Sequence, residues 1–277
     1  MKKSSKKLLF VFGHGWFYRR GLNFQKFFAE LFFKKATACF LLLTSCVSHA
    51  PPFATQPYEP FSRANAVAIA MDEWRLFGMR VDDSGGATYV QRDAAMAERQ
   101  PGLWERIGEY WWEGLSPGDP DSRWTGKHDA HGKVFPASVN GEYAWSAAFI
   151  SYVMRIAGAG PGFPYAADHA TYINAAARHE TTLLVAEDPA NYAPRLGDLV
   201  CFPRGRASHL TFQDLPTAHL FPAHCSIVVG GGVESVSIVG GNVDDAVTLE
   251  HLHANDAGEL CGNREKWFVI LKVNYRE

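Results

Sequence analysis

The stretch Trp145-Ser146-Ala147-Ala148-Phe149-Ile150-Ser151-Tyr152-Val153-Met154-Arg155-Ile156-Ala157 decides how the rest of the sequence is interpreted. Its apolar side chains recur every three or four positions, at Ala148, Phe149, Tyr152, Val153 and Ile156. This spacing predicts a helix that ends near Gly158, and the width of its apolar face indicates that the helix lies at the centre of a domain.

The segments around this helix predict an α+β domain over residues 61–277. Further helices are expected at 62–77, which Ser62 caps and Gly78 ends, at 103–114, and at 169–179, which Asp168 caps. After residue 180 the pattern changes to short strand-like runs at 199–202, 226–229, 236–239 and 267–273. The glycine runs 230–232 and 240–241 indicate hairpin turns. Helices followed by strands suggest an antiparallel sheet packed on the central helix.

Charge divides the chain into two chemically different parts. Residues 1–35 contain nine Lys or Arg and one Glu, a net charge of +8, whereas the remainder carries 18 basic and 28 acidic residues, a net charge of −10. Because binding of nucleic acid needs a basic face, the acidic part is not expected to bind nucleic acid. The 115–140 segment, rich in Gly, Pro, Asp and Ser, is expected to be a long loop, and loops of that length are often functional.

The basic part predicts an export signal over residues 1–45. Lys34-Lys35 precede an uncharged run at 36–45, which is too short for a membrane-spanning helix. Leu43-Thr44-Ser45-Cys46 resembles a bacterial lipobox, and the resemblance implies a lipid on Cys46 and attachment to the periplasmic face of the outer membrane. Residues 46–60 then form a Pro-rich tether. The alternative is an amphipathic helix at 22–35 on a membrane surface, with Cys46 an ordinary thiol.

Four motifs in order resemble papain-like cell-wall hydrolases of the CHAP and NlpC types. They are Trp145-Ser146-Ala147-Ala148-Phe149, Pro194-Arg195-Leu196-Gly197-Asp198-Leu199-Val200, His224-Cys225-Ser226-Ile227-Val228-Val229 and Ile238-Val239-Gly240-Gly241-Asn242. The acidic part as a whole also resembles the bacterial domain of unknown function 2272. The first resemblance implies a papain-like fold, with peptidoglycan or cell-wall peptides as partners and no cofactor.

The resemblance implies a catalytic site, but with one change. The hydrolases have a Cys nucleophile at the start of the central helix, where this chain has Ser146. A serine needs a base to take its proton, so His224 is the candidate base and Asn242 the candidate residue that orients it. The expected reaction is cleavage of an amide or peptide bond. The alternative is an inactive module that binds cell-wall peptides or an envelope partner in the same cleft.

Five further residues are candidates for substrate binding: Trp145, Tyr143, His169, Tyr172 and Asp198. His169 and Tyr172 stand one helical turn apart and are expected either to line the cleft or to serve as a cap and a core aromatic. Asp198 follows a glycine, a position that usually fixes a turn.

The spacing of the histidines and the number of cysteines bear on metal sites and disulfides. The histidine pairs 128/131, 219/224 and 251/253 lack zinc-ligand spacing, so no metal is expected. Cys201, Cys225 and Cys261 allow at most one internal disulfide, and both a Cys201–Cys225 bridge and a reduced state remain open. Because neighbours on a strand point to opposite faces, Cys225 is not expected to pair with His224 as a nucleophile.

Overall fold

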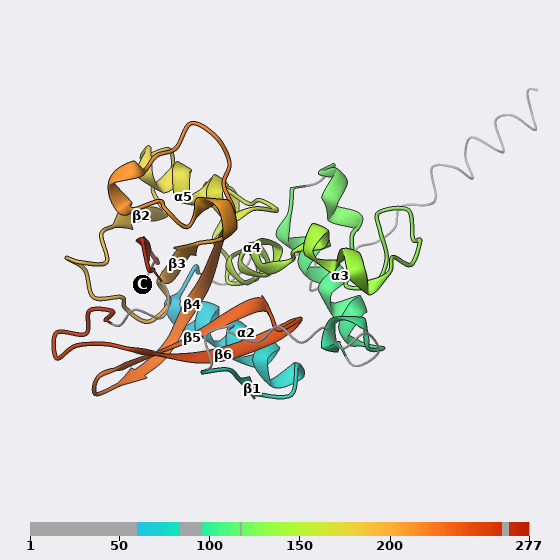
Figure 1. Cartoon of the computed structure of the whole chain (residues 1–277), viewed down its shortest axis with the longest axis horizontal. Helices are drawn as coiled ribbons and strands as arrows, with labels where there is room; N and C mark the ends of the chain where they lie inside the picture. Colours follow the sequence, from blue (N-terminus) through green and yellow to red (C-terminus); the bar gives the residue numbers. More distant parts are fainter. Residues whose placement is uncertain (1–59, 84–95, 117, 262–265, 277) are drawn as a thin grey trace, which may run out of the picture. The chain divides into compact units, whose positions relative to one another are not determined.

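The computed structural model describes residues 60–83, 96–116, 118–261 and 266–276, and within them a seven-stranded sheet and four α-helices (Figure 1). The described residues belong to one unit, Pro57–Glu277. The expected signal at 1–45, the lipidation site Cys46 and all but the last residue of the expected tether lie outside the described residues. No helix in the described part is long and apolar enough to cross a membrane.

The four predicted helices are present with ends close to those expected. They are α2 (Arg63–Leu76), α3 (Leu103–Gly114), α4 (Ser146–Ile156) and α5 (His169–Ala177). The predicted caps act as expected, because the Ser62 hydroxyl accepts the Asn65 N–H at 3.1 Å and Asp168 accepts the Thr171 N–H at 2.8 Å. Gly78, with φ of +86°, follows the end of α2 in the left-handed conformation that favours glycine.

The sheet has the order β1-β6-β5-β4-β3-β7-β2. Its strands are β1 (Arg80–Val81), β2 (Leu184–Glu187), β3 (Leu199–Pro203), β4 (Ala223–Gly232), β5 (Ser235–Val243), β6 (Ala246–His253) and β7 (Val269–Val273). The prediction of an antiparallel sheet is wrong at one edge, where β1 pairs with β6 in parallel, so the sheet is mixed. The chain enters β1 directly from α2, which sets its direction along the sheet.

The glycine runs do not form the predicted turns. Gly230–Gly232 end β4, Gly240 and Gly241 lie within β5, and the hairpin turns instead at Val233 and Glu234. Glu234 has φ of +61° there, a conformation that a tight hairpin turn requires. The glycines within β5 have a different role, because Gly241 leaves room beside the start of α4 and Gly240 leaves room beside His224 and Ser226.

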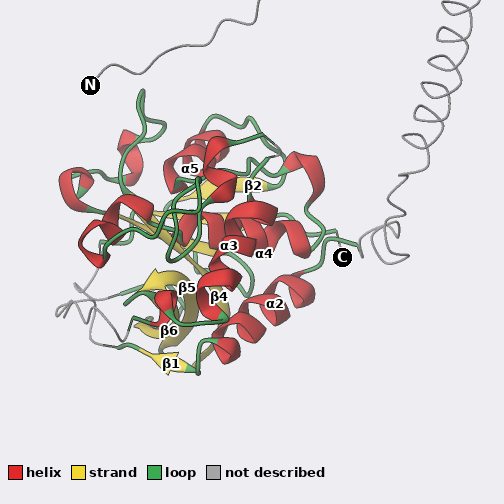
Figure 2. Cartoon of the chain, turned by 90° about the vertical axis from the view of Figure 1, so that its right-hand side faces the viewer, coloured by secondary structure: helices red, strands yellow, loops and turns green. Residues whose placement is uncertain are grey.

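Helix α4 lies between the sheet and α3 (Figure 1). It packs on β4 and β5, while α2 lies along β4–β6 and α5 lies beside β2 (Figure 2). The core between the sheet and these helices includes Phe149, Val153, Leu199, Ile227 and Leu271. A smaller cluster on the opposite face contains Val200, Val228, Ile238 and Ile270. The expectation of a central helix packed on a sheet is confirmed.

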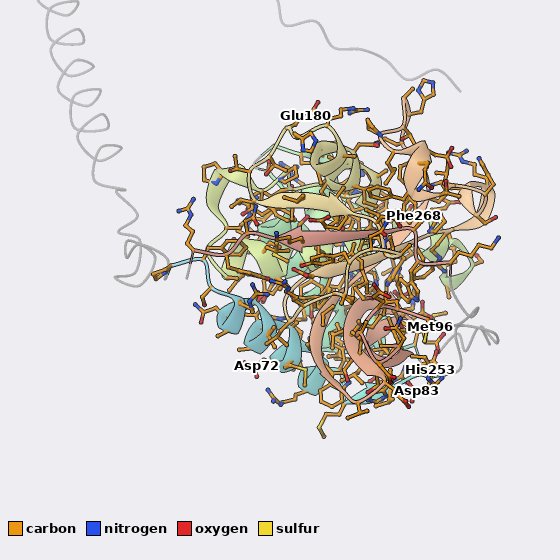
Figure 3. All side chains as sticks on the ribbon, turned by 90° about the vertical axis from the view of Figure 1, so that its left-hand side faces the viewer. Asp72, Asp83, Met96, Glu180, His253 and Phe268 are labelled. Atoms are coloured by element: carbon orange, nitrogen blue, oxygen red, sulfur yellow. A yellow bond between two sulfur atoms is a disulfide. The ribbon has the colours of Figure 1, made fainter. Side chains whose placement is uncertain are left out.

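A buried ion network joins three of the helices. Glu73 is buried on the inner side of α2, whereas its neighbour Asp72 lies on the outer side (Figure 3). Glu73 accepts hydrogen bonds from Arg106 Nε at 2.9 Å and from the Tyr110 hydroxyl at 2.6 Å, and Arg106 also donates to the Tyr152 hydroxyl at 2.5 Å. Because the carboxylate is paired and hydrogen-bonded, the cost of burying its charge is offset.

The first and last described residues of the domain contact each other. The backbone N–H of Arg276 donates to the carbonyl of Phe61 at 2.8 Å, and the rings of Phe61 and Tyr275 lie 4.6 Å apart. Phe61 is buried, so this contact fixes the start of α2 against the last residues after β7.

Cys201 and Cys225 form a disulfide between directly paired positions of β3 and β4. The bridge belongs to the core on the α4 side, and alternation along β4 places His224 and Ser226 on the opposite face, as expected. Cys225 is therefore neither a free thiol nor a partner of His224. Cys261 is a free, exposed thiol.

Candidate functional site

The Ser146 hydroxyl is paired with His169. Ser146 is the first residue of α4 and His169 is the first residue of α5, and the Ser146 Oγ lies 2.7 Å from the His169 Nε2. The other ring nitrogen of His169, Nδ1, is hydrogen-bonded to the Tyr172 hydroxyl one turn along α5. The three side chains thus form a continuous chain from a hydroxyl through an imidazole to a phenol.

A second pair of the same kind lies beside the first. His224 Nε2 is 3.2 Å from the Ser226 Oγ, and the centroids of the His224 and His169 rings are 5.4 Å apart. The other ring nitrogen of His224, Nδ1, is buried and has no hydrogen-bond partner among the residues that the structure describes. His224 therefore lies close to the site, but its hydrogen bond is to Ser226 and not to Ser146.

Two glycines of β5 make room for this arrangement. A Cβ atom at Gly240 would lie 2.5 Å from the Ser226 Oγ and 2.9 Å from the His224 Nε2. A Cβ atom at Gly241 would lie 2.6 Å from the Cβ of Phe149 and 2.8 Å from the indole of Trp145. Any side chain at either position would push apart β5 and the groups at the site.

Both imidazoles are held neutral at neutral pH. Burial lowers the pKa of His169 well below its ordinary range, and the nearby His224 and the cation of Arg204 add to the effect. Burial and Arg204 lower the pKa of His224 to about 3. A neutral imidazole has one nitrogen that can accept a proton, which a general base requires. If His169 Nδ1 carries the proton and donates to Tyr172, then Nε2 is free to accept from Ser146.

The start of α4 supplies hydrogen-bond donors beside Ser146. Trp145, the N-cap residue, makes no side-chain capping hydrogen bond, so the N–H groups of the first turn, including those of Ala147 and Ala148, have no intrahelical acceptor. These groups and the helix dipole favour negative charge at this point. An oxyanion that forms on attack by Ser146 would be stabilised there.

Trp145 is a structural residue beside the site. It is 1 % exposed and packs against the rings of Phe77 and Tyr110 at 5.9 and 5.8 Å. Its indole Nε1 donates to Glu98 at 2.8 Å. Burial, and to a lesser extent the charge of Asp245, raises the pKa of Glu98 to about 7. Glu98 thus holds the residue that precedes Ser146 and is itself a buried acid that titrates near neutrality.

The remaining candidates lie elsewhere. Tyr143 lies between the rings of Trp124 and Phe135, at 3.8 and 4.4 Å, at the end of a short 3-10 helix (Ala137–Tyr143) that precedes α4. Asp198 accepts the backbone N–H groups of Arg195 and Val273 and the Tyr192 hydroxyl, so it fixes the turn before β3. That turn is about 13 Å along β3 from the residue opposite His224.

Asn242 is the last residue but one of β5 and has φ of +59°. Within the described part of the chain it makes no hydrogen bond to either imidazole. The expected assignments of His224 as base and Asn242 as orienting residue stay predictions, while the geometry offers His169 and Tyr172 for the same two roles.

The sequence left open whether His169 lines the cleft or caps a helix and did not pair it with Ser146, and it gave no role to Ser226, Glu98 or Arg204. Ser226 could have been found, because a residue two positions from His224 on a strand shares its face. The contact of Ser146 with His169 joins two helix starts that are 23 residues apart, and nothing local signals it. No group of three metal-ligating side chains occurs in the described ranges.

Residues 98–273 match the family described as uncharacterized proteins conserved in bacteria, DUF2272. The chain belongs to this family. The match includes Ser146, His169, His224 and the whole of the sheet except β1, so the site lies within the part that defines DUF2272. No curated protein and no solved structure matches the chain.

Proposed function

We propose that this DUF2272 protein is a serine hydrolase of the bacterial envelope that cleaves an amide or peptide bond in peptidoglycan. The observation that carries the proposal is the 2.7 Å contact between the Ser146 Oγ and the His169 Nε2 at the uncapped start of α4. The motif order that resembles CHAP and NlpC hydrolases supports a papain-like relationship and the choice of substrate. The Cys201–Cys225 disulfide and the lipobox-like segment at Cys46 support an oxidising location outside the cytoplasm.

The residues divide the reaction between them. The Ser146 Oγ attacks the carbonyl carbon while His169 Nε2 takes its proton, and Tyr172 holds the ring through Nδ1. The N–H groups at the start of α4 receive the oxyanion. The C–N bond then breaks, and His169 returns the proton to the leaving amine. Water then attacks the acyl-serine while His169 takes its proton, and His169 returns that proton to the Ser146 oxygen as the carboxyl product leaves.

A fluorophosphonate probe, which reacts with activated serines, tests the nucleophile directly. We expect intact-mass analysis to show one adduct on the wild-type protein and none on Ser146→Ala or His169→Gln. Ser226→Ala is the matched control, because it removes the hydroxyl of the neighbouring pair and should retain the adduct. An adduct on Ser226, or none on the wild-type protein, would contradict the assignment.

Digestion of purified peptidoglycan tests the substrate. Wild-type protein should release fragments with new amino and carboxyl groups, and Ser146→Ala should release none above background. Loss of one member of such a serine–histidine pair usually lowers kcat by about 10⁴-fold or more. Equal release by the two proteins would refute the role of Ser146.

A second candidate is a non-catalytic module, which the burial of the pair favours: Ser146 is 6 % exposed and His169 4 %. In the other tautomer Tyr172 donates to Nδ1, and Nε2–H donates to Ser146 and cannot accept its proton. The pair would then only tie α4 to α5. Peptidoglycan binding that survives Ser146→Ala, without turnover by the wild-type protein, would favour this candidate.

A further inference from the structure

Arg204 lies directly beyond the end of β3, on the side of the sheet that carries His224. Phe202 is paired with His224 across β3 and β4, and Pro203 is paired with Ala223. Arg204 continues the extended backbone, with φ of −119° and ψ of 156°, and its N–H donates to the Pro222 carbonyl at 2.9 Å. Alternation therefore places the Arg204 side chain on the face of Phe202 and His224, about 7–8 Å from His224 along the diagonal of the strand pair.

The Arg204 guanidinium is an exposed cation that has no partner in the part of the chain that the structure describes. Among the described residues it makes no ion pair and no side-chain hydrogen bond, although the chain after residue 35 carries a net charge of −10. Its charge nevertheless acts on the site, because it contributes to the lowered pKa values of both His169 and His224. An unpaired cation beside two buried imidazoles is a place where an anionic group of a ligand would be favoured.

His224 supplies the second observation. Its Nδ1 is buried without a hydrogen-bond partner in the described ranges, in a residue that is 2 % exposed. If the Ser226 hydroxyl donates to Nε2, then Nδ1 carries a proton that has no acceptor. A buried donor left in this way costs about 1–3 kcal/mol, and an anion that reached it would recover that cost.

We propose that Arg204 and His224 bind a carboxylate of the substrate beside Ser146, so that the bond cleaved lies near a free carboxyl group. Arg204 would hold the carboxylate through its fork of N–H donors, and the His224 ring would turn toward it as the substrate enters. A singly charged carboxylate fits one cation and one N–H better than a phosphate with about two charges would. This site would define the substrate of the proposed hydrolase more closely. It rests on that proposed function, because the cleaved bond is located by the position of Ser146.

Calorimetry with two ligands of equal shape tests the carboxylate site without relying on turnover. The Ser146→Ala protein is titrated with N-acetyl-alanyl-alanine and with its C-terminal amide. We expect the acid to bind at least 10-fold more tightly than the amide. Adding Arg204→Gln should abolish this preference and leave the affinity for the amide unchanged, while Arg204→Lys should keep part of it.

Arg206→Gln is the matched control, because it removes the same charge from an exposed residue two positions along the chain. The preference for the acid should survive that change. The proposal is overturned if neither ligand binds, if the preference persists in Arg204→Gln, if Arg206→Gln reduces it equally, or if inorganic phosphate displaces the acid at lower concentration than acetate does. Failure of the proposed hydrolase would show instead in the labelling of Ser146, which this measurement does not use.

Discussion

Replacement of Glu98 by glutamine tests whether a buried acid beside the site controls the stability of the domain. Glu98 accepts the indole N–H of Trp145 at 2.8 Å, and burial is the main reason that its pKa is raised from 4.5 to about 7. Glutamine keeps an oxygen that can accept the same hydrogen bond but cannot ionise. The substitution therefore removes the titration and keeps the contact.

The sign and size of the effect follow from proton binding. In the unfolded chain the Glu98 carboxyl loses its proton near pH 4.5, whereas in the folded protein it keeps the proton up to about pH 7. Between these values the folded state binds more protons, so the free energy of unfolding falls by about 1.4 kcal/mol for each unit of rising pH. Between pH 5 and pH 8 the loss amounts to about 2.5 kcal/mol, and Glu98→Gln should be free of it.

Urea unfolding followed by tryptophan fluorescence at pH 5, 6, 7 and 8 measures the difference between the two proteins. The advantage of Glu98→Gln should grow with pH by about 2.5 kcal/mol. His224 titrates in the opposite direction, but it is present in both proteins and cancels in the comparison. Glu113→Gln, which removes a carboxyl group from an exposed position of α3, is the matched control. A difference for Glu98→Gln that stays within about 0.5 kcal/mol over this range would refute the reasoning.

Three further outcomes are expected. Because the pKa of His169 lies well below its ordinary range, the second-order rate constant for labelling of Ser146 by the fluorophosphonate probe should stay nearly constant from pH 7.5 to 5.5. With a base of ordinary imidazole pKa, the same rate constant would fall to about a tenth over this range. Gly240→Ala should lower the free energy of unfolding by about 1–3 kcal/mol through its clash with the second serine–histidine pair, and Gly230→Ala, whose Cβ would meet nothing nearer than 3.9 Å, should not. Glu73→Gln should lower the free energy of unfolding measured in urea by about 3 kcal/mol, because it breaks a buried ion pair. Glu109→Gln, at the exposed end of the same network, should lower it by less than about 1 kcal/mol.

The helices could be predicted because their signals are local. Ser62 and Asp168 are side-chain caps, and the apolar spacing after Trp145 fixes the buried face of α4. Strand β6 was not predicted, because the alternation of Val247-Thr248-Leu249-Glu250 covers only four residues and shifts by one position at His251-Leu252. Strand β1 has only two residues, and its place depends on pairing with β6.

The sequence predicted one member of the serine–histidine pair but not its partner. Ser146 could be located because the start of a central helix is a local feature. Its partner depends on how α5 approaches α4 after the intervening loop, and that approach is decided by packing across the whole core. His169 and His224 are both near enough to matter, and only the three-dimensional arrangement assigns the Ser146 hydroxyl to the first of them.

The contact of Phe61 with Arg276 and Tyr275 means that the domain begins and ends at one point on its surface. A short linker between these two ends would close the chain into a circle, and new termini could then be opened in an exposed loop such as Val233–Glu234 without loss of a strand. A further domain attached after residue 277 would emerge beside the segment that leads into α2.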